Sequence, residues 1–124
     1  MIRIIIAGSR TFQDFHLLET KLKEYMEQKQ LSLAEIEIIS GTANGADRLG
    51  ERFADKYGIP CSQFPANWDK YGKSAGYIRN NEMAKYAAEK TGVLFAFWDG
   101  TSKGTKHMID LAKKQGLDVH VVQF

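Results

Sequence analysis

The chain has 124 residues, which is enough for one domain with a single hydrophobic core. Its 17 lysines and arginines nearly balance its 15 aspartates and glutamates, so composition gives no support to a dedicated surface for nucleic acid. Cys61 is the only cysteine, which excludes an intrachain disulfide and a metal site with two or more thiolates. We expect a cytoplasmic protein without a signal peptide or membrane span, because the chain opens directly on a short strand-like segment.

The apolar, β-branched residues 2–7 are typical of a central strand that helices cover on both faces. A helix is predicted from Asp14, which can cap it, to about Gln30, because apolar residues recur there at the spacing of one helix face. Residues 36–40 predict the second strand. This order of strand, helix and strand is the beginning of an α/β domain.

A glycine-rich turn follows the second strand and leads into another helix. Asn44 is predicted to cap this helix, with Asp47 three residues later, and Gly58 is predicted to end it. Residues 59–64 predict the third strand. Cys61 lies within that strand and is therefore expected to be a small buried residue.

The second half of the chain repeats the alternation. Residues 65–75 form the only long irregular segment, and a loop of this length usually has a function. A helix is predicted from residue 76 to about residue 90, and a fully covered strand over residues 93–97. Ser102 is predicted to cap the last helix, and residues 119–122 to form the fifth strand.

The alternation of strands and helices predicts one Rossmann-like α/β domain over residues 1–124, with a five-stranded, mainly parallel sheet and helices on both faces. In the expected strand order 3-2-1-4-5, the first and fourth strands are neighbours. The crevice between their carboxyl ends is the topological switch point, where ligands bind in folds of this kind.

Three loops follow strand ends and lead into helices, at residues 8–10, 41–45 and 99–105. Glycines let the backbone approach a ligand closely, and the amides and dipole at a helix N-terminus favour a phosphate. Neither a G-x-G-x-x-G fingerprint nor a Walker loop is present. Any one of these loops is explained by turn and cap chemistry alone. Their convergence on one sheet edge favours a phosphate-binding site.

Side chains near these loops suit the other parts of a nucleotide. Arg10, Lys73 and Arg79 supply positive charge for phosphates, and Trp68 and Tyr71 can cover a base. The alternatives are that the aromatic residues belong to the core and that Arg79 forms a surface ion pair. The three histidines are far apart and lack clustered partners, so no metal site is expected.

Four segments carry a family resemblance: "IIIAGSRTF", "GTANGADRLGERFA", "NWDKYGKSAGYIRNNEMA" and "FAFWDGTSKGTKHMIDLA". Together they cover most of the chain and resemble the SLOG superfamily, in particular its compact branch related to the YspA and YpsA proteins. The superfamily also includes the LOG and DprA proteins. The resemblance implies a Rossmann-like fold that binds a nucleotide or a nucleotide-derived molecule, with no other cofactor.

The resemblance also implies which residues bind the ligand. By their match to the family motifs these are Gly8, Ser9, Arg10, Gly41, Asn44, Gly45, Asp47, Arg79, Asn80, Gly104 and Thr105. Loop positions and side-chain chemistry add a second group to the predicted site, namely Thr42, Trp68, Tyr71, Lys73, Asp99, Gly100 and Ser102.

One departure from the family pattern bears on catalysis. LOG enzymes, which release a base from a nucleoside monophosphate, carry P-G-G-x-G-T-x-x-E, and the alignment puts Met108 in place of the glutamate. Methionine neither activates water nor stabilises an oxocarbenium-like transition state. Asp47, Asp99 or Glu82 are the alternative carboxylates. Because the glutamate of the LOG enzymes is missing, the sequence favours binding (as a sensor or a sequestering protein) over hydrolysis.

Two further alternatives concern partners. Binding of single-stranded DNA, as in DprA, is the weakest functional hypothesis because the net charge is small. A homo-oligomer is an open alternative, since related folds often pair through helices.

Overall fold

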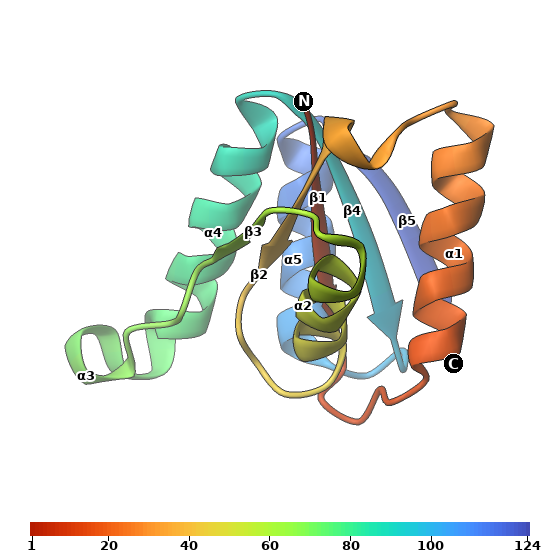
Figure 1. Ribbon diagram of the computed structural model, residues 1–124. Coiled ribbons are helices and arrows are strands. Elements are labelled where there is room, and N and C mark those ends of the chain that lie inside the picture. Colours follow the sequence, from red (N-terminus) through yellow and green to blue (C-terminus); the bar gives the residue numbers. More distant parts are fainter.

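The computed structural model describes all residues, 1–124, and its centre is a sheet of five parallel strands (Figure 1). The order is β3-β2-β1-β4-β5. The strands are β1 (Ile2–Gly8), β2 (Ile36–Ser40), β3 (Cys61–Gln63), β4 (Thr91–Trp98) and β5 (Asp118–Gln123). The predicted Rossmann-like α/β fold and its strand order are therefore confirmed, and β1 and β4 are neighbours at the switch point.

Helices cover both faces of this sheet. They are α1 (Phe15–Gln28), α2 (Ala46–Tyr57), the short α3 (Trp68–Tyr71), α4 (Ala75–Ala88) and α5 (Lys103–Lys114). Single 3₁₀ turns lie at Leu33–Glu35 and Gly72–Ser74. Helices α1 and α2 pack on one face, and α4 and α5 on the other, while α3 projects from the body of the domain (Figure 1). None of the helices combines the length and apolar composition that crossing a membrane requires.

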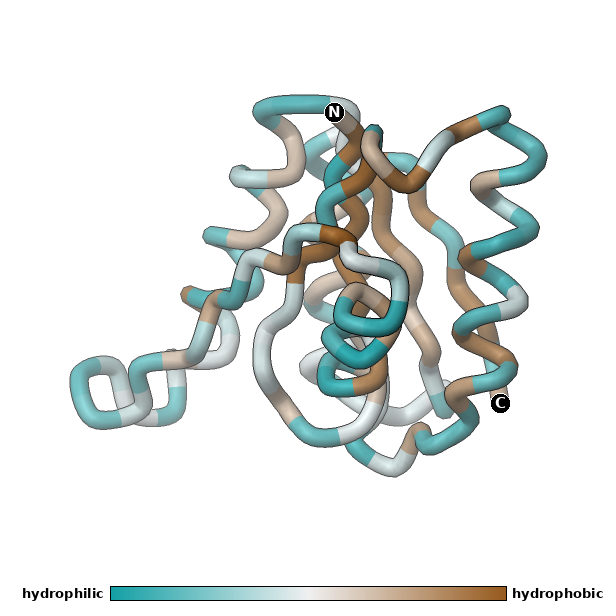
Figure 2. Tube along the Cα trace, viewed as in Figure 1, coloured by the Kyte–Doolittle hydropathy of each residue, from teal (hydrophilic) through white to brown (hydrophobic).

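The two faces of the sheet have separate hydrophobic cores because successive strand side chains point to opposite sides. In β1, Ile4 and Ile6 pack under α1 and α2, whereas Ile5 and Ala7 pack under α4 and α5. The apolar residues accordingly concentrate in the strands and on the inner sides of the helices (Figure 2). Covering both faces explains why β1 and β4 read as nearly continuous apolar runs in the sequence.

Two local expectations are wrong. The third strand is only three residues long, and Cys61 at its start is exposed because β3 is an edge strand that pairs with β2 alone. The segment 65–75 is not irregular. The Asn67 side chain accepts a hydrogen bond from the Lys70 amide at 3.1 Å and so caps α3, and a 3₁₀ turn then leads directly into α4.

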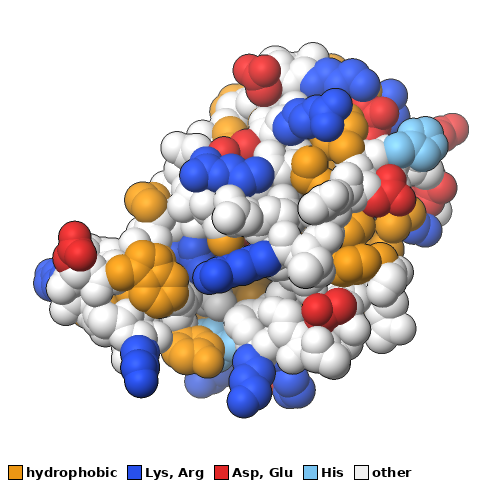
Figure 3. All heavy atoms as spheres, turned by 90° about the horizontal axis from the view of Figure 1, so that it is seen from below, with side chains coloured by type: hydrophobic (Ala, Val, Ile, Leu, Met, Phe, Trp, Pro, Cys, Tyr) orange, Lys and Arg blue, Asp and Glu red, His pale blue; other side chains and the backbone are white.

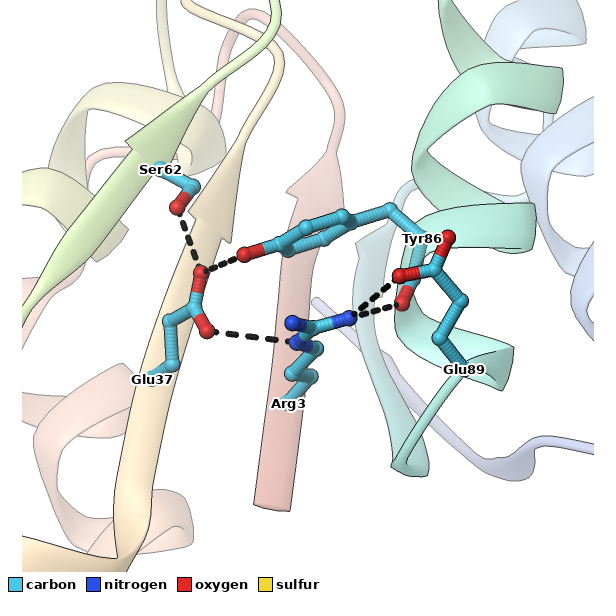
Figure 4. A network of polar contacts seen from close by, with 5 residues as sticks. All are labelled: Arg3, Glu37, Ser62, Tyr86 and Glu89. Carbon is cyan, nitrogen blue, oxygen red and sulfur yellow. Dashed lines mark hydrogen bonds and ion pairs between the residues drawn. The ribbon is translucent and has the colours of Figure 1, made fainter. Parts of the chain in front are cut away.

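A polar network ties α4 to the amino ends of the strands (Figure 4). Glu37, on β2, accepts hydrogen bonds from Arg3 at 3.2 Å, from Ser62 at 2.5 Å and from the Tyr86 hydroxyl at 2.5 Å. Arg3 also donates to the Tyr86 carbonyl at 2.7 Å and to Glu89 at 3.1 Å, and its guanidinium lies 3.6 Å from the centre of the Tyr86 ring. The buried carboxylate is thus fully paired, as burial of a charge requires.

Glu37 therefore favours folding in its ionised form. Burial raises its pKa, but the hydrogen bonds from Ser62 and Tyr86 and the charge of Arg3 outweigh this and hold the pKa below its ordinary value. A lowered pKa in the folded state means that the stabilisation is present above the unfolded pKa and is lost as the pH falls through the folded one.

We predict that Glu37→Gln lowers the free energy of unfolding by roughly 2–3 kcal/mol at pH 7, because it leaves Arg3 without its buried counter-ion. The difference from wild type should shrink at pH 3. Urea titrations at both pH values measure it. Glu89→Gln is the matched control and should have little effect, because Glu89 is exposed. Equal losses for the two variants would contradict the importance of the buried pair.

Candidate functional site

The three loops predicted from the sequence meet at the carboxyl edge of the sheet, and Ser9 joins them. The Ser9 amide donates to the Phe97 carbonyl at 2.9 Å, and its hydroxyl accepts from the Asp99 amide at 3.1 Å. Its carbonyl accepts from the Ala46 amide at 3.4 Å. Ser9 is only 2% exposed, so these bonds lie away from water. The loops after β1, β2 and β4 are consequently held as one unit.

The loop after β2 is shaped by Gly45 rather than by Asn44. Gly45 has a φ of 86° and is the N-cap of α2, whereas Asn44 is exposed, so the predicted Asn44 cap is wrong. A Cβ added to Gly45 would lie 2.4 Å from the Ser9 carbonyl oxygen, which leaves no room for a side chain. Instead, Asp47 turns back, and its Oδ2 accepts a hydrogen bond from the Ala43 amide at 3.2 Å.

A cavity of about 220 Å³ opens at this edge, between the loops and the beginnings of α4 and α5. Ten of the predicted site residues line it: Gly8, Arg10, Asp47, Trp68, Lys73, Arg79, Asn80, Ser102, Gly104 and Thr105. Eight others do not: Ser9, Gly41, Thr42, Asn44, Gly45, Tyr71, Asp99 and Gly100. The sequence reasoning did not include the lining residues Ala7, Ala43, Gly76, Tyr77 and Met83.

Several residues outside the lining shape the loops. Asp99 accepts hydrogen bonds from the amides of Thr101 and Ser102, both at 2.9 Å, and these bonds lower its pKa. Its carboxylate therefore fixes the loop before α5. Glu82 is exposed on α4 and does not line the cavity either. Asp47 is thus the only one of the three alternative carboxylates that faces the cavity.

Arg79 also lines the cavity, and hydrogen bonds hold its guanidinium group in place. It donates to the Gly41 carbonyl through Nη1 and to Asn80 Oδ1 through Nε, the latter at 3.0 Å. Asn80 in turn donates to the Gly104 carbonyl at 3.3 Å, and its Nδ2 lies 3.2 Å from His107 Nδ1. Asn80 is 6% exposed, so its amide is occupied within the protein. Its role in this structure is to fix Arg79 relative to α5.

Three cations, Arg10, Lys73 and Arg79, line the cavity without forming a direct ion pair, and Asp47 is the only acidic residue in the lining. Burial lowers the pKa of Arg79, Asp47 opposes this, and the nearby charge of Arg10 lowers it further. Arg10 is exposed, lines the cavity and forms no ion pair. The space-filling view onto this edge shows Lys and Arg side chains around and across a hollowed surface (Figure 3). Such a group of unpaired cations attracts an anion.

The beginning of α5 adds a second source of positive potential. Ser102 caps this helix, accepting from the Thr105 amide at 3.4 Å, and its hydroxyl lies 3.1 Å from that of Thr105. Gly104 follows one residue after the helix starts, and a Cβ added there would meet no atom within 4 Å. Packing of the protein therefore does not require glycine at this position. Its small size instead leaves the first turn of α5 open to the cavity.

Aromatic side chains stand at the cavity mouth. Trp68 is 52% exposed and Tyr77 is 47% exposed, and both line the cavity. Trp68 lies over Gly76, where an added Cβ would be 3.5 Å from the indole, and the Tyr77 ring packs edge-on against His107 at 4.5 Å. Hydrophobic side chains are visible beside the hollow on the side of α3 (Figure 3). Tyr77, rather than the predicted Tyr71, accompanies Trp68.

Asp47 is a buried carboxylate that is incompletely paired. It is 5% exposed, and no ion pair within 4 Å joins it to Arg79. Burial raises its pKa to about 6, although the Ala43 amide and the charges of Arg79 and Arg48 oppose this shift, and Glu51 adds to it. The cavity thus contains a carboxyl group with a pKa of about 6. No group of three or more metal-ligating side chains is present.

We predict that Asp47→Asn raises the stability at pH 7.5. The folded pKa of about 6 exceeds the ordinary value of 3.8, so ionisation of Asp47 makes the folded protein less stable as the pH rises between these values. The neutral isostere avoids this cost and should add roughly 1–3 kcal/mol at pH 7.5 and almost nothing at pH 3.5. Thermal unfolding at both pH values measures the effect.

The matched control is Asp69→Asn, since Asp69 is exposed on α3. This control should leave the melting temperature unchanged at both pH values. A loss of stability in Asp47→Asn at pH 7.5 would show that Asp47 serves the fold rather than the cavity.

Comparison with known proteins agrees with the motifs. A family model described as the YspA, cpYpsA-related SLOG family matches residues 2–71, which run from β1 to α3. The Gene 61 protein of Mycobacterium phage D29 is 32% identical over 124 residues, and the match covers 96% of this chain and 94% of that protein. No solved structure matches the chain. The chain therefore belongs to the YspA, cpYpsA-related SLOG family.

Proposed function

We propose that the protein binds a nucleotide or a nucleotide-derived molecule, with an anionic group held by Arg10, Arg79 and the first turn of α5. The observation that carries this proposal is the convergence of two guanidinium groups, neither of them in a direct ion pair, and an open helix N-terminus on one cavity in which Asp47 is the only acidic residue. A phosphate offers the acceptor oxygens that both guanidinium groups and backbone amides require.

The aromatic residues support a nucleotide rather than a simple phosphate. Trp68 and Tyr77 present exposed rings at the mouth, and stacking of a base on such rings contributes roughly 1–3 kcal/mol. The cavity of about 220 Å³ is smaller than the roughly 300–1,000 Å³ of pockets that enclose a drug-sized ligand. A sugar phosphate fills it, and the base then stacks at the mouth.

Binding for sensing or sequestration fits the lining better than turnover. Met108 is 1% exposed and lines the cavity, so an apolar side chain occupies the position that the resemblance assigns to the glutamate of LOG enzymes. Hydrolysis of a nucleoside phosphate is the second candidate, because Asp47 is a cavity carboxyl with a pKa of about 6, which suits a general acid or base.

Chromatography distinguishes the two candidates. We expect AMP, ADP-ribose and NAD to be recovered intact after incubation with the protein. Release of a base that disappears in Asp47→Asn would instead establish the hydrolase, with Asp47 as the group that acts on the ligand.

The Arg10→Ala variant tests the anion site. Its side chain makes no hydrogen bond or ion pair within the protein, so the melting temperature should be unchanged. We predict that AMP affinity, measured by calorimetry, falls roughly 10- to 100-fold, as expected for loss of a charged hydrogen bond. Lys85→Ala, an exposed position on α4, removes the same charge away from the cavity and should bind AMP normally. Equal affinity in both variants would contradict the anion site.

Gly104→Ala tests the open turn of α5. The added methyl group meets nothing in the protein, and alanine favours a helix, so folding should be unchanged or slightly more stable. We predict that AMP affinity falls at least about tenfold, because the methyl group projects toward the space that the phosphate would use. Unchanged affinity would show that the phosphate does not approach this turn.

A further inference from the structure

Asp47 has one carboxylate oxygen that the protein leaves without a partner. Its Oδ2 accepts from the Ala43 amide at 3.2 Å, whereas Oδ1 accepts no hydrogen bond from any other residue. The side chain is 95% buried and lines the cavity. Because Oδ1 keeps some accessible surface while the residue as a whole is buried, a hydrogen-bond donor inside the cavity can reach it.

No lysine or arginine of the protein donates a hydrogen bond to Asp47 Oδ1. A Cβ added to Gly41 would lie 2.7 Å from Arg79 Nη1 and 2.8 Å from Asp47 Oδ2, so the two side chains approach the same point beside Gly41 without forming a direct ion pair. Arg79 directs Nη1 to the Gly41 carbonyl, and its Nη2 lies near Gly76, on the side of Trp68. Arg79 is thus fixed by other contacts and does not pair directly with Asp47.

Three chemically different groups of residues therefore line one small cavity. Arg10 and the first turn of α5 suit an anion, Trp68 and Tyr77 suit a planar ring, and Asp47 suits a neutral hydrogen-bond donor. A ribose of a nucleotide carries three matching substituents: a phosphate, a base and hydroxyl groups. A ribonucleotide in the cavity would therefore find a matching group in the lining for each of these substituents.

We infer that Asp47 accepts a hydrogen bond from a ribose hydroxyl of the ligand, and that the site therefore selects ribonucleotides over deoxyribonucleotides. This inference rests on the proposed function, because it requires the nucleotide to occupy the cavity. Selectivity follows because a deoxyribose leaves the buried carboxylate without a partner, and sites built to bind a hydroxyl discriminate strongly against ligands that lack it.

The experiment compares AMP, 2′-deoxy-AMP and 3′-deoxy-AMP by calorimetry, with wild type, Asp47→Asn and the exposed control Asp69→Asn. In wild type and in Asp69→Asn, at least one deoxy analogue should bind roughly 10- to 100-fold more weakly than AMP. In Asp47→Asn, the amide oxygen can keep the Ala43 bond, which leaves an amide nitrogen in place of the acceptor. The preference for AMP should then fall to within about threefold.

The outcomes separate this inference from the proposed function. Equal binding of all three nucleotides to wild type would overturn the inference and leave the proposed function intact. An unchanged preference for AMP in Asp47→Asn would also overturn the inference, and so would an equal loss of affinity for all three nucleotides. In either case Asp47 would not be the group that recognises the hydroxyl. Absence of binding by all three nucleotides to wild type would overturn both.

Discussion

The buried hydrogen bonds of Ser9 are the interactions on which the site depends. A parallel sheet brings the carboxyl ends of its strands to one edge, but it leaves the loops that follow free to take many conformations. Ser9 removes much of this freedom by bonding to β4, to Asp99 and to the start of α2. Gly45 allows this contact because its missing side chain lets two backbones meet. The cavity is therefore a consequence of loop packing as much as of sheet topology.

Charged side chains are paired at the amino ends of the strands and lack direct ion-pair partners at the carboxyl ends. At the amino ends, Arg3 and Glu37 are paired and hydrogen-bonded, so burying them is compatible with stability. At the carboxyl ends, Arg10 has no acidic partner, and Asp47 is buried with one oxygen free. The concentration in one cavity of charged groups that lack a direct ion-pair partner is the physical basis of the proposed ligand site.

Family membership and structure constrain the function to different degrees. The match over residues 2–71 and the phage relative establish the SLOG family, and both leave the ligand open. The second half of the chain supplies Arg79, Tyr77 and the first turn of α5, which the family model does not cover. These residues supply the proposed partners of the phosphate and the base, whereas Asp47, the proposed partner of the ribose, lies within the matched residues. Met108, which is buried and lines the cavity, is the reason that we propose binding ahead of hydrolysis.

The sequence by itself determined the fold, because strands covered on both faces read as apolar runs and amphipathic helices alternate with them. It also predicted that the three glycine-rich loops open on one edge, since that follows from strand direction, and charge chemistry and the family resemblance added Arg79 to the predicted site. Only the tertiary structure decided which residues line the cavity. Asn44 is exposed and Asp99 holds a loop through hydrogen bonds, whereas Asp47 and Tyr77 line the cavity. Side-chain direction in loops depends on contacts between segments far apart in the chain, and local sequence patterns do not encode those contacts.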